Sequence, residues 1–295
     1  MDYGTRLVSM DHAIIDIHTH IVFGIDDGGI DFEESLRLIS MEYDQGVRGI
    51  FCTSHSYGML QHHEDYHRNF GRMKSAVQTR HSDLSLYKGC EVLCTKHRMP
   101  EIIQKINAGI FPTLNGTRYI LTEFSPLATA GMEEMRYCLE FMLDKGFIPV
   151  IAHAERYEAI YDDPLNDVAW MKELGCLIQI NLFSVKQDTG WRKELANAFL
   201  EHHIVDFVGT DTHNLGYKSP QVAIGAETIR KYGTQYANHI LHGNAKKSYC
   251  LKTDKQRYES REEDGIEEHL HQAESDAEMA RNVLESVIGF LEYRY

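Results

Sequence analysis

The chain has 295 residues, of which 43% are hydrophobic and 25% charged, and its formal net charge is −14. This composition predicts a globular protein with one large core, because α/β barrels of this length commonly fold as one domain. The negative charge excludes sequence-independent nucleic-acid binding, which needs a positive surface. The N-terminus has no signal-peptide layout and no run of about 18 apolar residues occurs, so we expect no membrane insertion and a cytoplasmic location.

Short apolar runs alternate with amphipathic segments along most of the chain. Seven runs predict strands, at 13–19, 48–54, 84–92, 118–124, 147–154, 175–181 and 206–212. Seven further segments predict helices, at 31–46, 64–80, 97–108, 132–145, 164–174, 191–203 and 219–231. This alternation predicts a parallel sheet, and the chain length favours a closed or distorted barrel over an open sheet.

The sequence changes character near residue 252, where a stretch dense in charge begins. Beyond it, apolar residues recur at spacings of four and three from Ile266 to Leu291, which predicts an amphipathic C-terminal helix. We favour docking of this helix on its own domain; the alternative is an intermolecular coiled coil that forms a homo-oligomer. The predicted organisation is an N-terminal extension (1–12), a main domain (13–251), and a charged linker with the helix (252–295).

Residue types that bind metal ions recur where the predicted strands end. A His-x-His pair ends the first strand, and alternate residues of a strand point to the same face, so both imidazoles can reach one ion. Six of the seven predicted strands end in histidine, aspartate or glutamate residues that can bind a metal ion, and a loop after the first strand adds a carboxylate. The candidates are His18, His20, Asp27, His55, Glu91, Glu123, His153, Asp211 and His213. In barrels the chemistry lies at the carboxyl ends of the strands, so these side chains are expected to meet.

Five imidazoles and four carboxylates without a thiolate select divalent ions such as Mn²⁺, Fe²⁺, Zn²⁺ or Mg²⁺. Nine ligands are too many for one ion and predict a site with two or three metals. Such sites stabilise the attacking and leaving oxygens of phosphoryl transfer and activate a water molecule. Gly28 and Gly29 follow Asp27 without a G-x-x-x-x-G-K motif, so they predict a tight turn that presents Asp27.

Several sequence blocks, in order, resemble the polymerase and histidinol phosphatase (PHP) superfamily. They are IIDIHTHIVFGIDDG, TSH, GCE, LTEFS, PVIAHAERY and GTDTHN, and they span about residues 12 to 250. The first block, the IAHAERY block and PTLNGTRYILTEFS are more closely similar to the bacterial manganese-dependent protein-tyrosine phosphatases. These are encoded beside the tyrosine kinases of capsule or exopolysaccharide synthesis.

The resemblance implies a distorted (β/α)7 TIM-like barrel that holds three divalent ions, with manganese as the first expectation. His18, His20, Glu91 and Asp211 would hold one ion, Glu91, Glu123 and His153 a second, and Asp27, His55 and His213 a third. Arg156 would bind the phosphoryl oxygens during attack by a metal-activated water. Lys218 stands where the family commonly has an arginine, and Ser56-Tyr57-Gly58 where it often has basic residues.

The resemblance also implies a partner, a bacterial tyrosine kinase with phosphotyrosines on an exposed tail. One alternative is a small-molecule phosphatase, such as a histidinol-phosphate phosphatase, with the same metals and another pocket. A second alternative is a metal-binding regulator without turnover. A cysteine phosphatase is excluded, because no cysteine is followed six positions later by arginine.

Overall fold

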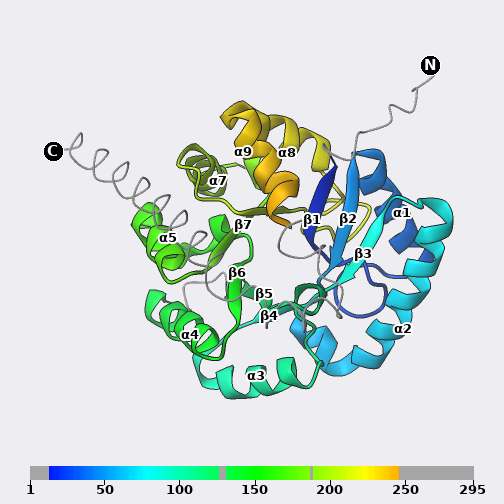
Figure 1. Ribbon diagram of the computed structural model, residues 1–295, viewed down its shortest axis with the longest axis horizontal. Coiled ribbons are helices and arrows are strands. Elements are labelled where there is room, and N and C mark those ends of the chain that lie inside the picture. The colour runs from blue at the N-terminus through cyan, green and yellow to red at the C-terminus, as the bar shows by residue number, and fades with distance from the viewer. Residues whose placement is uncertain (1–12, 126–130, 187–188, 246–295) are drawn as a thin grey trace, which may run out of the picture.

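The computed structural model describes residues 13–125, 131–186 and 189–245. The predicted N-terminal extension and the C-terminal helix, with the oligomer it could form, lie outside these ranges and stay predictions. In Figure 1 the strands occupy the middle of the molecule and most of the helices surround them. No helix in the described ranges is long and apolar enough to cross a membrane.

Eight strands lie within the described residues, and each pair that forms a ladder is parallel. They are β1 (Ile14–Thr19), β2 (Val47–Cys52), β3 (Ser85–Lys88), β4 (Glu91–Leu93), β5 (Tyr119–Glu123), β6 (Ile148–Ile151), β7 (Leu177–Asn181) and β8 (Phe207–Gly209). One sheet has the order β1-β2-β3 and the other β4-β5-β6-β7-β8. The predicted α/β fold with parallel sheets is therefore confirmed.

The closed seven-stranded barrel does not follow from this pairing. The predicted third strand is divided at Gly89 and Cys90 into β3 and β4, which belong to different sheets. At the carboxyl ends, isolated bridges join Thr19 to Thr212 and His55 to Glu91. The two sheets therefore approach each other near the predicted ligands.

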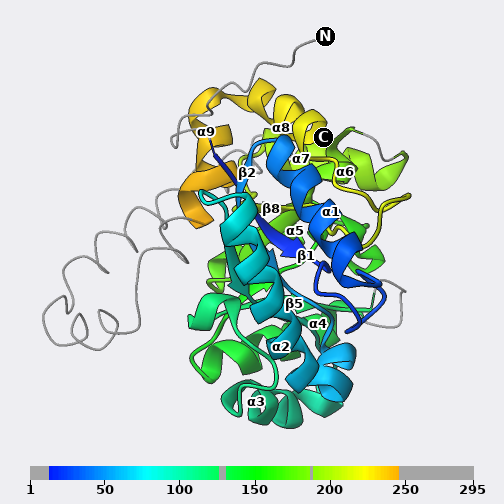
Figure 2. The same ribbon diagram turned by 90° about the vertical axis from the view of Figure 1, so that its right-hand side faces the viewer.

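The helices follow the predicted alternation. They are α1 (Phe32–Asp44), α2 (Ser56–Arg80), α3 (Met99–Asn107), α4 (Met132–Asp144), α5 (Pro164–Glu173), α6 (Leu182–Lys186), α7 (Trp191–Glu201), α8 (Val222–Ile229) and α9 (Thr234–Asn238). Figure 2 shows α1 and α2 passing over the strands on one side of the molecule. The second helix begins at Ser56 rather than at residue 64, so the Ser56-Tyr57-Gly58 segment is its first turn.

Local sequence explains the position of α1. The Asp31 side chain accepts a hydrogen bond from the Glu34 amide, which caps the helix, and Glu33 and Glu34 lie in its first turn. After the helix, Gly46 has φ +99°, a conformation that glycine adopts easily. The chain can then enter β2, and all six residues of β1 beside it are buried. Burial on both faces is typical of parallel strands covered by helices.

Candidate metal centre

The nine predicted ligands converge where β1, β2, β5, β6 and β8 end and where β4 begins, since Glu91, predicted at the end of the third strand, is the first residue of β4. His18, His20 and Glu91 are fully buried, whereas the side chain of Asp27 is 57% exposed. The cluster therefore extends from the interior to the surface. Four overlapping groups of its side chains have ligand atoms within 4.8 Å of one another.

Glu91, at the start of β4, is the centre of this cluster. Its Oε2 atom lies 3.2 Å from His18 Nε2, 3.2 Å from His20 Nε2 and 3.0 Å from His55 Nδ1. Its Oε1 atom lies 2.9 Å from His153 Nε2. One carboxylate thus lies within 3.2 Å of four imidazole nitrogens, and both of its oxygens face possible metal ligands.

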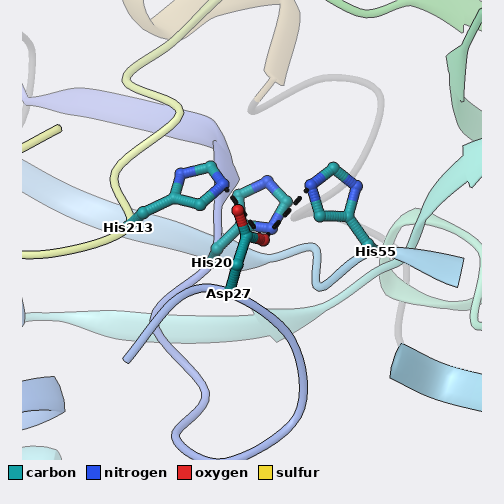
Figure 3. A group of neighbouring side chains, drawn as sticks. All are labelled: His20, Asp27, His55 and His213. Carbon is teal, nitrogen blue, oxygen red and sulfur yellow. Dashed lines mark ion pairs between the residues drawn. The ribbon is translucent and has the colours of Figure 1, made fainter. Parts of the chain in front are cut away.

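A second part of the cluster lies at the solvent edge. Asp27 Oδ1 is 3.6 Å from His55 Nε2 and 3.6 Å from His213 Nε2. Figure 3 shows the three side chains turned toward one another with His20 beside them. The rings of His20 and His213 stack at 3.9 Å between centroids. The predicted trio of Asp27, His55 and His213 is therefore brought together.

The glycines after Asp27 act through space rather than through an unusual backbone angle. A Cβ atom on Gly28 would lie 1.9 Å from the backbone oxygen of His20, and the Gly29 amide donates a hydrogen bond to the same oxygen at 2.9 Å. The loop can return so closely to His20 because Gly28 has no side chain. This is the tight turn that the sequence predicts.

Glu123, at the end of β5, lies between two histidines. Its Oε2 atom is 3.5 Å from His55 Nδ1 and its Oε1 atom 3.9 Å from His153 Nε2. The predicted group of Glu91, Glu123 and His153 is brought together. His55 also joins the two glutamates, and therefore lies between this group and that of Asp27.

The donor atoms fit metal ions better than they fit one another. Glu91 Oε2 is buried beside three ring nitrogens and forms no hydrogen bond with any residue that the structure describes. His18 Nε2 and His20 Nε2 lie 3.1 Å apart, although only one of them could donate a proton to the other. Lone pairs that face a common point are the arrangement that a divalent cation requires.

Residues outside the predicted set orient the imidazoles. Asp26 Oδ2 lies 2.9 Å from His20 Nδ1, and Gln179 Oε1 lies 3.2 Å from His18 Nδ1. The backbone oxygen of Asp211 lies 2.7 Å from His213 Nδ1. When each Nδ1 is protonated and donates to its acceptor, the Nε2 lone pair of the same ring is free to bind a metal ion.

Sequence reasoning missed Asp26 and Gln179. Gln179 lies on β7, the one predicted strand that ends without a ligand, and its amide nitrogen donates to Asn181 Oδ1 at 2.9 Å. Asn181 in turn donates to Asp211 Oδ2 at 3.2 Å. Gln179 and Asn181 are two amide side chains at alternate positions of an otherwise apolar run, and this pattern could have identified Gln179.

Two of the candidate ligands have left-handed backbones. His153 has φ 33° and Asp211 has φ 56°, which few residues other than glycine adopt. Each follows a short buried strand, β6 and β8 respectively. Strained conformations of this kind cluster at functional sites, where the surroundings hold them in place.

Electrostatic coupling within the cluster is strong. Burial disfavours the charged imidazole of His55, but Glu123 and Glu91 outweigh this effect and raise its pKa to about 11. Burial and His55 oppose protonation of His20, yet Asp26 and Glu91 raise its pKa to about 9. Burial and the neighbouring His20 lower the pKa of His213 to about 3. The carboxylates therefore attract positive charge into this cluster.

Arg156 and Lys218, the predicted substrate-binding residues, lie beside the cluster. Arg156 Nη1 donates to Asp211 Oδ2 at 2.5 Å, while its buried Nε has no hydrogen-bond partner among residues 13–125, 131–186 and 189–245. Lys218 Nζ lies 3.1 Å from His213 Nε2. Both residues, with Asp211, line a cavity of about 270 Å³. An anion in this cavity would meet two cations next to the metal ligands.

A family profile and curated relatives are similar to most of this chain. The profile of the family described as "Capsular polysaccharide synthesis, CpsB/CapC" matches residues 14–249. A tyrosine-protein phosphatase CpsB of Streptococcus agalactiae is 37% identical over 243 residues, which are 79% of this chain and 96% of that protein. Tyrosine-protein phosphatase YwqE of Bacillus subtilis is 29% identical over 232 residues, 77% of this chain and 84% of that protein.

A solved structure shares the fold. It comes from work on YwqE of Bacillus subtilis and CpsB of Streptococcus pneumoniae, described as unique metal-dependent tyrosine phosphatases. It matches with a TM-score of 0.68 and 23% identity, over 81% of this chain and 96% of that chain. The family profile covers most of the chain, and the match to relatives above 30% identity covers nearly the whole length of those relatives. The chain therefore belongs to the CpsB/CapC family.

Proposed function

We propose that this chain is a metal-dependent phosphoric monoester hydrolase that removes phosphate from phosphotyrosine in proteins. The observation that carries the proposal is the cluster around Glu91, with Arg156 bound to one of its members, Asp211. The names of the relatives, tyrosine-protein phosphatases, support the choice of substrate.

We assign the nine clustered residues to three divalent ions, with manganese as the first candidate and iron, zinc or magnesium as alternatives. Glu91 would bridge two of the ions. When bound, such ions lower the pKa of a water molecule and neutralise phosphoryl oxygens. We also propose that the two sheets correspond to a distorted (β/α)7 barrel whose ligands lie at its carboxyl-terminal rim.

The residues of the chain position the substrate in this proposal. Arg156 is oriented by Asp211 and keeps a buried Nε–H group for which the described part of the chain offers no acceptor. A phosphoryl oxygen in the cavity could accept a hydrogen bond from this group. The forked guanidinium can donate to two oxygens of one phosphoryl group. Lys218 would add a second cation at the other side of the phosphoryl group.

The proposed partner is a bacterial tyrosine kinase that regulates capsule or exopolysaccharide synthesis. The family description names capsular polysaccharide synthesis, and the exposed edge at Asp27 leaves the cluster accessible to a flexible phosphorylated tail. A histidinol-phosphate phosphatase or a regulator without turnover would use the same ligands, but the relatives' names give neither of them support.

The test is phosphate release by the manganese-supplemented protein from a phosphotyrosine peptide, a phosphoserine peptide and histidinol phosphate. We expect hydrolysis of the phosphotyrosine peptide in preference to the other two, and its loss in His153→Ala. The matched control is His81→Ala, because His81 precedes β3, at the opposite ends of the strands. Preference for histidinol phosphate, or equal rates in His153→Ala and the unmodified chain, would refute the proposal.

A further inference from the structure

The cavity beside Asp211 extends beyond the residues that the proposed function uses. Phe183 from α6, Arg192 from α7 and Tyr217 from the loop after β8 also line it, with Thr210 and Ser219. Its volume of about 270 Å³ is just below that of typical small-molecule pockets, which have about 300–1,000 Å³. It therefore has room for one phosphorylated side chain beside the cluster.

Charge in this cavity is opposite to that of the whole chain. Arg156, Arg192 and Lys218 line it together with one carboxylate, Asp211, which already pairs with Arg156. The chain as a whole has a net charge of −14. A local excess of cations on an otherwise acidic protein favours the binding of an anionic ligand at this cavity.

Arg192 is the one cation of this lining to which the proposed function assigns no contact with the phosphoryl group. It is exposed, and no residue in the described ranges forms an ion pair with it. Its guanidinium lies 5.5 Å from the centre of the adjacent Trp191 ring. Since Arg156 and Lys218 already lie next to the metal ligands, Arg192 is available to a second anionic group of the substrate.

The aromatic residues of the cavity supply a surface for a ring. Phe183 and Tyr217 lie edge to face, with centroids 5.6 Å apart and planes at 65°. Tyr217 is 79% exposed, an unusual position for so large a side chain, and Phe183 is half-buried beneath it. A third ring packed here would bury Tyr217 and gain the quadrupolar attraction of aromatic pairs.

We propose that Phe183 and Tyr217 bind the aryl ring of phosphotyrosine and that Arg192 binds an acidic side chain next to it. The preferred substrate is therefore a phosphotyrosine flanked by aspartate or glutamate. This inference rests on the proposed function and specifies its substrate class. Lys218 follows Tyr217 in the chain and its Nζ atom contacts His213, so it connects the aryl surface to the cluster.

Binding of a non-hydrolysable ligand tests the role of Arg192 without turnover. Two peptides contain a phosphonate analogue of phosphotyrosine, flanked on both sides by glutamate in one and by glutamine in the other. We expect the glutamate peptide to bind the manganese-loaded chain about three-fold tighter by calorimetry, because exposed ion pairs contribute about 0.2–1 kcal/mol. Arg192→Gln loses this preference and Arg192→Glu reverses it.

The matched control is Arg118→Gln, because Arg118 is an exposed arginine that precedes β5 at the opposite ends of the strands. It keeps the preference for the glutamate peptide. Equal binding of the two peptides to the unmodified chain, or a preference that survives in Arg192→Gln, would overturn the assignment of Arg192.

The aromatic surface is tested by the ratio of kcat/KM for phenyl phosphate to that for ethyl phosphate. Tyr217→Ala and Phe183→Leu lower this ratio about five-fold, whereas Tyr137→Ala, on the outer helix α4, leaves it unchanged. An unchanged ratio in the first two variants overturns the aryl assignment. If no ester is hydrolysed while Arg192 still selects the glutamate peptide, the hydrolase function fails and the assignment of Arg192 stands.

Discussion

Arg156 donates a hydrogen bond of 2.5 Å to Asp211 Oδ2, while the other oxygen of the same carboxylate faces the paired histidines. Asp211 Oδ1 lies 3.5 Å from His20 Nε2 and 3.6 Å from His18 Nε2. The carboxylate therefore fixes the guanidinium relative to the metal centre. In the proposed function, the same contact would place a phosphoryl group bound by Arg156 beside the cluster.

Arg156→Lys should lower kcat/KM for a phosphotyrosine peptide by about 10²–10³, because a preorganised donor to the developing charge contributes on this scale. Bound manganese should stay unchanged, since the lysine still supplies a positive charge next to Asp211. Steady-state kinetics and metal analysis measure the two effects, with Arg118→Lys as the matched control. A decrease below about three-fold would remove Arg156 from the site.

Asp26→Asn should weaken metal binding by about 10–100-fold, the usual effect of losing a residue that orients a ligand. Asp26 accepts from His20 Nδ1, from the His55 amide and from the Gly28 amide, so the variant disturbs the position of two ligands. Manganese titration followed by calorimetry gives the affinity. Asp83→Asn, in an exposed ion pair with Arg48, is the control. Equal affinities in the two variants would contradict the role of Asp26.

Lys218→Arg should raise kcat/KM for phosphotyrosine about three- to ten-fold, because a guanidinium can donate two parallel hydrogen bonds to a phosphoryl group. In the structure Lys218 Nζ instead lies 3.1 Å from His213 Nε2, where a bound cation would repel it toward the cavity. Kinetics on the same peptide measure the gain. An unchanged rate would show that residue 218 does not contact phosphate.

The metal-free protein should lose stability as the pH rises above neutrality. The folded-state pKa of His20 is about 9 and that of His55 about 11, both raised by nearby carboxylates against burial. The folded chain therefore binds more protons than the unfolded chain above pH ~6.5. Stability supplied by these protons is complete below that pH and is lost as the pH rises through the folded-state values.

Urea unfolding of chelator-treated protein at pH 6.5 and 9 measures this loss as a lower midpoint at pH 9. Manganese-loaded protein should show a smaller change over this interval, because the metal ions replace the bound protons. A midpoint that rises with pH in the chelator-treated protein would contradict the assignment.

Glu42 on α1 lowers the free energy of unfolding, and a substitution can remove this effect. It is fully buried, neither of its oxygens has a hydrogen-bond partner among the described residues, and burial beside Asp16 raises its pKa well above the usual range. Glu42→Leu should raise the free energy of unfolding at pH 7 by about 1–3 kcal/mol, the cost of an unsatisfied buried polar group. Glu33→Leu, at an exposed position of α1, is the control for urea unfolding. A destabilised Glu42→Leu would disprove the account.

Periodicity located most of the fold. The runs at 13–19 and 175–181 became β1 and β7, because buried parallel strands are apolar on both faces. The division of the third predicted strand could not be foreseen, since Gly89 and Cys90 continue its apolar pattern. The early start of α2 at Ser56 was missed because Tyr57 and Gly58 carry no helix signal.

The candidate ligands were predictable because they belong to strand ends, which the topology brings to one rim. Asp26 was not, since its role depends on a side-chain direction that no sequence pattern fixes, and Gln179 was marked only by the pair of amides on β7. The aromatic pair of Phe183 and Tyr217 comes from a short helix and a loop far apart in the sequence. Their proximity is a result of packing alone.

The most direct test of the central claim is phosphate release from a phosphotyrosine peptide by chelator-stripped protein, before and after manganese is restored. We expect no release before manganese is restored, recovery afterwards, and no recovery in Glu91→Gln, because Glu91 contacts four of the clustered imidazoles. Release that persists in the stripped protein, or full recovery in Glu91→Gln, would contradict the central claim.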